Sequence, residues 1–70
     1  MTDIEALKEC INQSGMTITF IADKAGMLRE TFYNRLKYGD FKASEVYSLS
    51  KVLGLTVKQR DKIFFADKSE

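Results

Sequence analysis

The chain of 70 residues contains no proline, no histidine and no tryptophan, and it has a single cysteine. With Cys10 alone an intramolecular disulfide is excluded, and without histidine a zinc site built from Cys and His is excluded as well. We expect Cys10 to be a small residue at the edge of the core. No apolar run approaches the roughly 20 residues that a membrane-spanning helix needs, and the acidic amino terminus does not fit a signal peptide. These absences favour a soluble, cytoplasmic protein.

The length and the spacing of the apolar residues indicate one small all-α domain. A chain of 70 residues suffices for one core, so we expect a single domain over 1–70 with an ordered core at about 3–66. Aliphatic and aromatic residues recur with helical spacing, without repeats or low-complexity tracts. No nucleophile has a base at a workable spacing, and no glycine-rich loop fits a phosphate group. We therefore do not expect an enzyme, and we expect no cofactor, metal ion or small-molecule substrate.

The charges are unevenly distributed although the net charge is only +1. Residues 1–16 carry one basic and three acidic side chains, whereas residues 17–42 carry five basic and three acidic ones. An excess of positive charge on one part of a chain is what a one-sided nucleic-acid interface requires. Taken alone, it is a weak indication of such an interface.

Five short helices are predicted from end signals. The first opens with a capping box between Thr2 and Glu5 and ends at Gly15, and the second follows Thr17 and ends at Gly26. The third runs from residue 28 or 29 to 37 and is closed by Gly39. The fourth follows a loop at 40–42 and stops at Gly54, and the fifth opens with a capping box between Thr56 and Gln59. The apolar residues expected to face the core are Ile4, Leu7, Ile11, Ile18, Ile21, Ala22, Ala25, Phe32, Leu36, Val46, Leu49, Leu53, Val57, Ile63 and Phe64.

The third predicted helix has a polar outer face that its core contacts do not explain. On a helical wheel Phe32 and Leu36 point inward together, while Glu30, Asn34 and Lys37 point away. Arginine bonds guanine, asparagine bonds adenine and glutamate accepts from cytosine, so this face carries the side chains that read the edges of base pairs in the major groove. Such a helix needs a preceding helix across the sugar-phosphate backbone and a tight turn between the two. Ala22 allows the close approach, and Gly26 allows the turn.

One set of positions carries a family resemblance: Thr17, Ile21, Ala22, Gly26, Met27, Phe32, Leu36 and Gly39, followed by Leu49, Leu53, Gly54 and Leu55. This pattern resembles the Cro and cI-type (lambda-repressor-like, XRE) helix-turn-helix family of phage and bacterial regulators, and most of all the short, single-domain Cro-type proteins. The resemblance spans residues 3–66. It implies a compact five-helix DNA-binding domain whose second and third helices form the helix-turn-helix. It also implies a transcription regulator in the cytoplasm of a bacterial host, binding a pseudo-palindromic operator in double-stranded DNA as a weak homodimer.

The resemblance also implies roles for individual residues. The base-contacting positions correspond to Leu28, Arg29, Glu30, Tyr33 and Asn34. The phosphate-contacting positions correspond to Thr17, Thr31, Lys37, Tyr38 and Lys42. Two residues depart from the family pattern. Leu28 replaces the usual Ser or Thr cap and is left to touch a thymine methyl, and Arg35 replaces an aliphatic residue and is expected at the surface near the DNA backbone.

Several residues have two interpretations. Glu30 suits either the helix dipole or a role in specificity. Phe20 is expected to pack against the first helix, with a partner contact as the alternative. Phe65 lies off the buried face of the last helix and is predicted to form a dimer seam, unless it folds back over the core. The alternative function is a protein-binding module, such as an antirepressor or an inhibitor of a host or phage factor, that uses the third helix and Phe65 without specific DNA binding.

Overall fold

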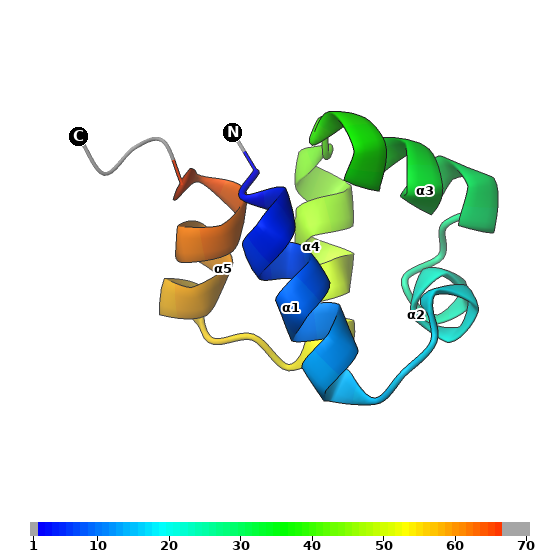
Figure 1. Cartoon of the computed structure of the whole chain (residues 1–70), viewed down its shortest axis with the longest axis horizontal. Coiled ribbons are helices and arrows are strands. Elements are labelled where there is room, and N and C mark those ends of the chain that lie inside the picture. Colours follow the sequence, from blue (N-terminus) through cyan, green and yellow to red (C-terminus); the bar gives the residue numbers. More distant parts are fainter. Residues whose placement is uncertain (1, 67–70) are drawn as a thin grey trace.

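A computed structural model describes residues 2–66, and these residues form five α-helices without a strand. The helices are α1 (Ile4–Ser14), α2 (Ile18–Lys24), α3 (Arg29–Tyr38), α4 (Ala43–Leu53) and α5 (Val57–Phe64). Figure 1 shows α1, α4 and α5 side by side, with α2 and α3 toward the other end of the long axis. Helix α4 is central, because it contacts α1, α2 and α5. The radius of gyration of 11.0 Å matches the value of about 11 Å for a compact domain of this length.

The predicted helix ends are confirmed at most positions. The Thr17 hydroxyl accepts a hydrogen bond from the backbone N–H of Phe20 (3.0 Å), so it caps α2. Thr56 and Gln59 form the reciprocal capping box that opens α5, with bonds of 2.9 and 3.1 Å. Gly54 closes α4 with a positive φ of 67°. Local signals of this kind depend on a few neighbouring residues, and tertiary packing does not override them here.

The predicted start of the first helix is wrong by one residue. Asp3, not Thr2, is the N-cap of α1, and its carboxylate accepts from the backbone N–H of Ala6 (3.1 Å). The Asp3 backbone N–H donates to the carbonyl of Ile63 (2.7 Å) and thereby ties the start of the chain to α5. Thr2 is instead buried, 8% exposed. Aspartate caps as well as threonine does, and the register chosen here also satisfies the tie to α5.

The core joins all five helices. Phe32, Leu7, Ile21 and Leu49 are its largest fully buried side chains. An edge-to-face chain of aromatic rings runs from Phe32 to Phe41 (6.4 Å between centroids) and on to Phe64 (5.4 Å), which fastens α3 to α5 through the α3–α4 loop. The buried apolar set is Leu7, Ile11, Ile21, Ala22, Phe32, Leu36, Val46, Leu49, Ile63 and Phe64.

Two core predictions are wrong. Val57 is 64% exposed although it shares a helical face with Phe64, because seven residues, about 10 Å of helix, separate the two and the core does not extend that far. Phe20 is 46% exposed on α2 rather than packed against α1, and the ammonium of Lys24 lies 5.4 Å from the centre of its ring. Helical periodicity gives the direction of a side chain about its own axis, but it does not say where a neighbouring helix ends. Within residues 2–66 no helix has the length and apolar character to cross a membrane.

Candidate nucleic-acid interface

The turn between α2 and α3 is built by a Schellman motif. Ala25 is the C-cap of α2, and Gly26 takes the left-handed conformation with φ of 74°. The N–H of Met27 donates to the carbonyl of Ala22 (2.8 Å), and that of Gly26 donates to Asp23 (3.1 Å). Ala22 is 1% exposed, so its methyl group keeps the α2 backbone close to the core. This arrangement changes the direction of the chain within a few residues, and α3 starts directly afterwards.

Helix α3 is held from one side only. Phe32 is fully buried and Leu36 is 5% exposed, whereas Tyr33 and Asn34 between them face solvent. The outer face of α3 consists of five exposed residues, and Leu28 precedes them at the N-cap. These five are Arg29, Glu30, Tyr33, Asn34 and Lys37. The exposure predicted for this face is confirmed, while its contacts to bases stay a prediction.

Leu28 begins α3 without a side-chain cap. Its backbone is extended (φ −68°, ψ 143°) as an N-cap requires, yet its side chain accepts no hydrogen bond and is 74% exposed. A leucine in this position neither stabilises the helix end nor joins the core. It therefore presents an apolar group to solvent at the amino-terminal tip of the outer face.

The residues expected to contact phosphates divide into separate groups. Thr31 and Lys42 line one polar hollow of about 470 Å³, which Leu28 and Ser44 also border, between the α2–α3 turn and the start of α4. Lys37 and Tyr38 end α3, and the ammonium of Lys37 lies 5.4 Å from the Tyr38 ring centre. Thr17 stands apart at the start of α2. The structure thus brings Thr31 and Lys42 together and leaves Thr17 outside that hollow.

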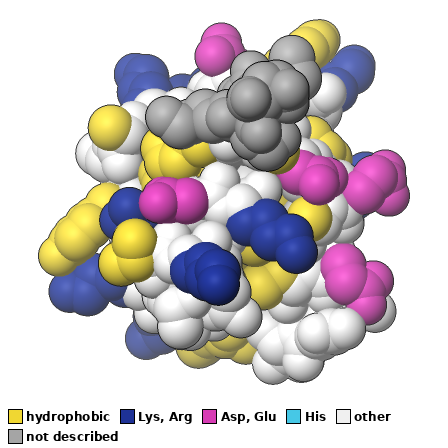
Figure 2. All heavy atoms as spheres, turned by 90° about the vertical axis from the view of Figure 1, so that its left-hand side faces the viewer, with side chains coloured by type: hydrophobic (Ala, Val, Ile, Leu, Met, Phe, Trp, Pro, Cys, Tyr) yellow, Lys and Arg dark blue, Asp and Glu magenta, His cyan; other side chains and the backbone are white. Residues whose placement is uncertain are grey.

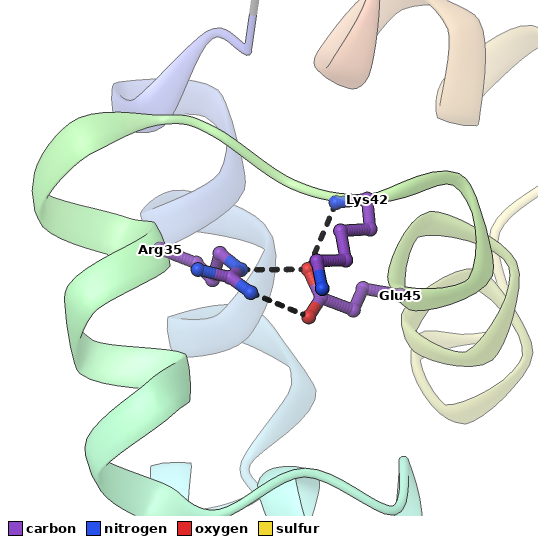
Figure 3. A network of polar contacts seen from close by, with 3 residues as sticks. All are labelled: Arg35, Lys42 and Glu45. Atoms are coloured by element: carbon purple, nitrogen blue, oxygen red, sulfur yellow. Dashed lines mark hydrogen bonds and ion pairs between the residues drawn. The ribbon is translucent and has the colours of Figure 1, made fainter.

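Arg35 is not the surface residue that the sequence predicted. Its guanidinium binds the Glu45 carboxylate through two hydrogen bonds, Nε to Oε1 at 2.8 Å and Nη2 to Oε2 at 3.1 Å (Figure 3). Oε1 also accepts a hydrogen bond from the backbone N–H of Lys42 (2.8 Å), and this bond caps the start of α4. The side chains of Arg35 and Glu45 are 24% and 13% exposed. This partner, ten residues away, turns the guanidinium toward α4, so Arg35 is partly buried, while its place near the DNA backbone stays a prediction.

The pKa values of this pair follow from the same contacts. The hydrogen bond from Arg35 holds the pKa of Glu45 below its usual value, the Lys42 N–H adds to this effect, and burial opposes it. The hydrogen bond to Glu45 raises the pKa of Arg35. Glu45 stands three residues after the N-cap Lys42, which is the place of the acidic member of a capping box. This spacing was the sequence signal that could have identified Glu45 as a structural residue.

Cys10 and Phe65 lie away from the outer face of α3. Cys10 is half-buried against the core, as predicted, and burial raises the pKa of its thiol, which disfavours the reactive thiolate. Phe65 follows α5 and is 40% exposed, beside a hollow that it shares with Tyr47 and Arg60. Tyr47 on α4 is 61% exposed, and sequence reasoning missed it. Figure 1 places α5 and α3 at opposite ends of the long axis.

Comparison of the chain with protein-family models, with curated proteins and with solved structures finds no match. The resemblance to helix-turn-helix regulators therefore depends on the residues of this chain alone.

Proposed function

We propose that this protein is a sequence-specific DNA-binding transcription regulator of the Cro and cI helix-turn-helix kind, as a short phage or prophage repressor would be. One observation carries the proposal: α3 follows a tight turn, buries only Phe32 and Leu36, and presents Arg29, Glu30 and Asn34 to solvent. An α-helix fits the major groove of B-DNA, and these three side-chain types recognise guanine, cytosine and adenine respectively.

In this proposal α3 enters the major groove and α2 crosses the sugar-phosphate backbone. Arg29 and Asn34 form paired hydrogen bonds with base edges, and Leu28 contacts a thymine methyl. Glu30 accepts from cytosine and repels sites where its carboxylate would face another acceptor. Tyr33 completes the reading face. Thr17, Thr31, Lys37, Tyr38 and Lys42 contact phosphates and fix the register of the helix.

A second copy of the chain would supply the second half of the operator. Phe65 and Tyr47 expose aromatic surface on the α4–α5 side, together with Val57. Figure 2 shows the end of the molecule that carries α5, where hydrophobic side chains are exposed among charged ones of both signs. Burial of such a mixed surface favours a weak dimer. The proposal requires this dimer to present its α3 helices to major grooves about 34 to 36 Å apart, one turn of the duplex, and thereby to occlude a promoter.

The competing function is a protein-binding module of the same fold, acting as an antirepressor or an inhibitor without specific DNA binding. The near-neutral net charge of +1 and the exposed aromatic rings favour it. The two functions differ in one measurement. A gel shift on DNA upstream of the protein's own coding sequence gives a discrete complex at low salt if the protein binds DNA specifically, and none if it binds only proteins.

The decisive experiment selects binding sites from a random DNA pool with the purified protein and sequences the survivors. We expect a short motif repeated with two-fold symmetry, with half-site centres about one helical turn apart. A pool that stays random after repeated selection would contradict the proposal.

A further inference from the structure

A groove of about 650 Å³ lies between α1, the α1–α2 loop and α3, and most of the residues that line it have no part in the proposed DNA contacts. Ile11 and Leu36 form its floor, and they are 7% and 5% exposed. Met16 and Ile18 add apolar surface from the loop and from the start of α2. Tyr33 borders the groove on the α3 side and is half exposed. Its size falls within the range of pockets that hold a ligand or the anchor side chains of a peptide.

The rim of the groove is basic. Lys8 borders it from α1 and Lys37 from α3, and Asn12 adds an amide group. Among the described residues that line it there is no acidic side chain. The groove thus combines an apolar floor with positive charge on two opposite walls, and its occupant must carry apolar groups flanked by negative charge.

The apolar floor of the groove does not suit a phosphate backbone as the occupant. A sugar-phosphate chain would satisfy the two lysines, but it has no apolar side chain to cover Ile11, Met16 and Leu36. A protein segment with leucine or phenylalanine on one side and glutamate or aspartate on the flanks satisfies both requirements. Helix-in-groove recognition follows this pattern, with apolar anchors at helical spacing.

We infer that this groove is a docking site for an acidic amphipathic segment of another protein, and that its occupant excludes DNA from α3. The exclusion follows because Tyr33 and Lys37 belong both to the groove and to the proposed DNA-contacting set. Such a partner would release the protein from its operator. The exclusion depends on the DNA-binding function proposed above, whereas binding in the groove does not.

The test uses three synthetic helical peptides of about twelve residues, long enough for three helical turns, that share one leucine stripe and differ only in their polar residues, which are Glu, Gln or Lys. Each is titrated into the isotope-labelled full chain, and the backbone amide NMR shifts are followed. The Glu peptide should shift the amides of Ile11, Asn12, Gly15 and Leu36 saturably, the Gln peptide less, and the Lys peptide least. Equal shifts from all three, or shifts confined to α4 and α5, would overturn the inference.

A matched pair of charge reversals locates the recognition. Lys8→Glu, at the rim, should weaken the Glu peptide about two- to five-fold and strengthen the Lys peptide by a similar factor. Lys58→Glu makes the same change in net charge on α5, outside the groove, and should leave both affinities unaltered. If both variants lose the same affinity for the Glu peptide, net charge alone explains the loss, and the assigned site is wrong. Groove shifts that appear with protein concentration alone would identify a second copy as the occupant and contradict the proposal.

Competition with a labelled duplex that carries the selected operator tests the exclusion of DNA separately from peptide binding in the groove. Displacement of the duplex by the Glu peptide supports the exclusion of DNA, and a duplex that stays bound at saturating peptide refutes it. If no duplex binds, the DNA-binding function fails while the peptide titration still decides whether the groove is a docking site.

Discussion

Arg35 of α3 and Glu45 of α4 share two parallel hydrogen bonds, of 2.8 and 3.1 Å, and the same carboxylate accepts the backbone N–H of Lys42. One carboxylate thus joins the proposed recognition helix, the loop after it and the start of α4 (Figure 3). The fork of the guanidinium fixes both distance and direction, which a single bond from lysine would not do.

This pair makes stability depend on pH. Because the pKa of Glu45 is lowered in the folded chain, its contribution is complete above the ordinary glutamate pKa of about 4.3 and is lost as the pH falls through the folded value. Glu45→Gln should lower the urea midpoint at pH 7, and its difference from the parent protein should shrink as the pH falls below that ordinary pKa and through the folded value. Asp61→Asn, in the more exposed pair of Asp61 with Arg60 (3.0 Å), should change little. If the Glu45→Gln variant keeps the same deficit at every pH, charge is not its cause.

Two cations of α3 should have different effects on DNA binding. Arg29→Ala should cost about 1 to 3 kcal/mol on the selected operator and relax specificity at one base pair. Lys37→Ala should weaken all sequences alike and lower the slope of log affinity against log salt by about one. Fluorescence anisotropy on operator and random duplexes at several salt concentrations measures both. Equal losses on the two duplexes for both variants would refute the division of roles.

The turn before α3 should be sensitive to the backbone preference of residue 26. A Cβ built on Gly26 meets nothing within 4 Å, so only the positive φ of 74° opposes a side chain. Gly26→Ala should lower the free energy of unfolding by about 1 to 2 kcal/mol, and Gly26→Asn by less, since asparagine tolerates this conformation better. Urea denaturation compares the three proteins. An asparagine variant as unstable as the alanine variant would point to lost space rather than backbone strain.

The uncapped start of α3 offers a stabilising substitution. Leu28→Ser places a hydroxyl at an N-cap whose backbone is already extended, and it removes a side chain that is 74% exposed. We expect the free energy of unfolding to rise by about 0.5 to 1 kcal/mol. Leu28→Ala is the control and should bring no gain, because alanine accepts no hydrogen bond. If both variants gain equally, removal of the exposed leucine, and not the cap, explains the result.

Self-association should depend on Phe65 and not on apolar exposure in general. Phe65→Ser should shift the dimer to monomer in analytical ultracentrifugation without loss of helix content. Phe20→Ser is the matched control, because Phe20 is exposed to a similar extent (46% against 40%) but lies on α2. Parent protein that remains monomeric at high concentration, with and without DNA, would contradict the dimer.

The helices were largely predictable because their ends are set locally. Gly15, Gly39 and Gly54 each take a positive φ at a helix end, and Thr17 and Thr56 cap their helices as their sequence positions predicted. The two-sided character of α3 was predictable for the same reason, since Phe32 and Leu36 stand one turn apart.

The exposure of Val57 and Phe20 and the pairing of Arg35 depend on distances between helices, which the periodicity of the sequence does not give. Val57 lies on the helical face that points toward the core but is exposed, because the core does not extend to it. Phe20 is exposed on α2. The contact between Arg35 and Glu45, ten residues away, depends on where α3 and α4 lie relative to each other. Contacts between elements are set by how the helices are placed in space, and a wheel drawn for one helix cannot give that placement.

The hydrogen bond from the N–H of Asp3 to the carbonyl of Ile63 decides where a label can be attached. A fluorophore or affinity tag attached at residue 2 would lie near α5 and also near Gly39, which closes α3. A protein tagged there should understate both its operator affinity and its tendency to pair, so both measurements call for protein without a tag at this end.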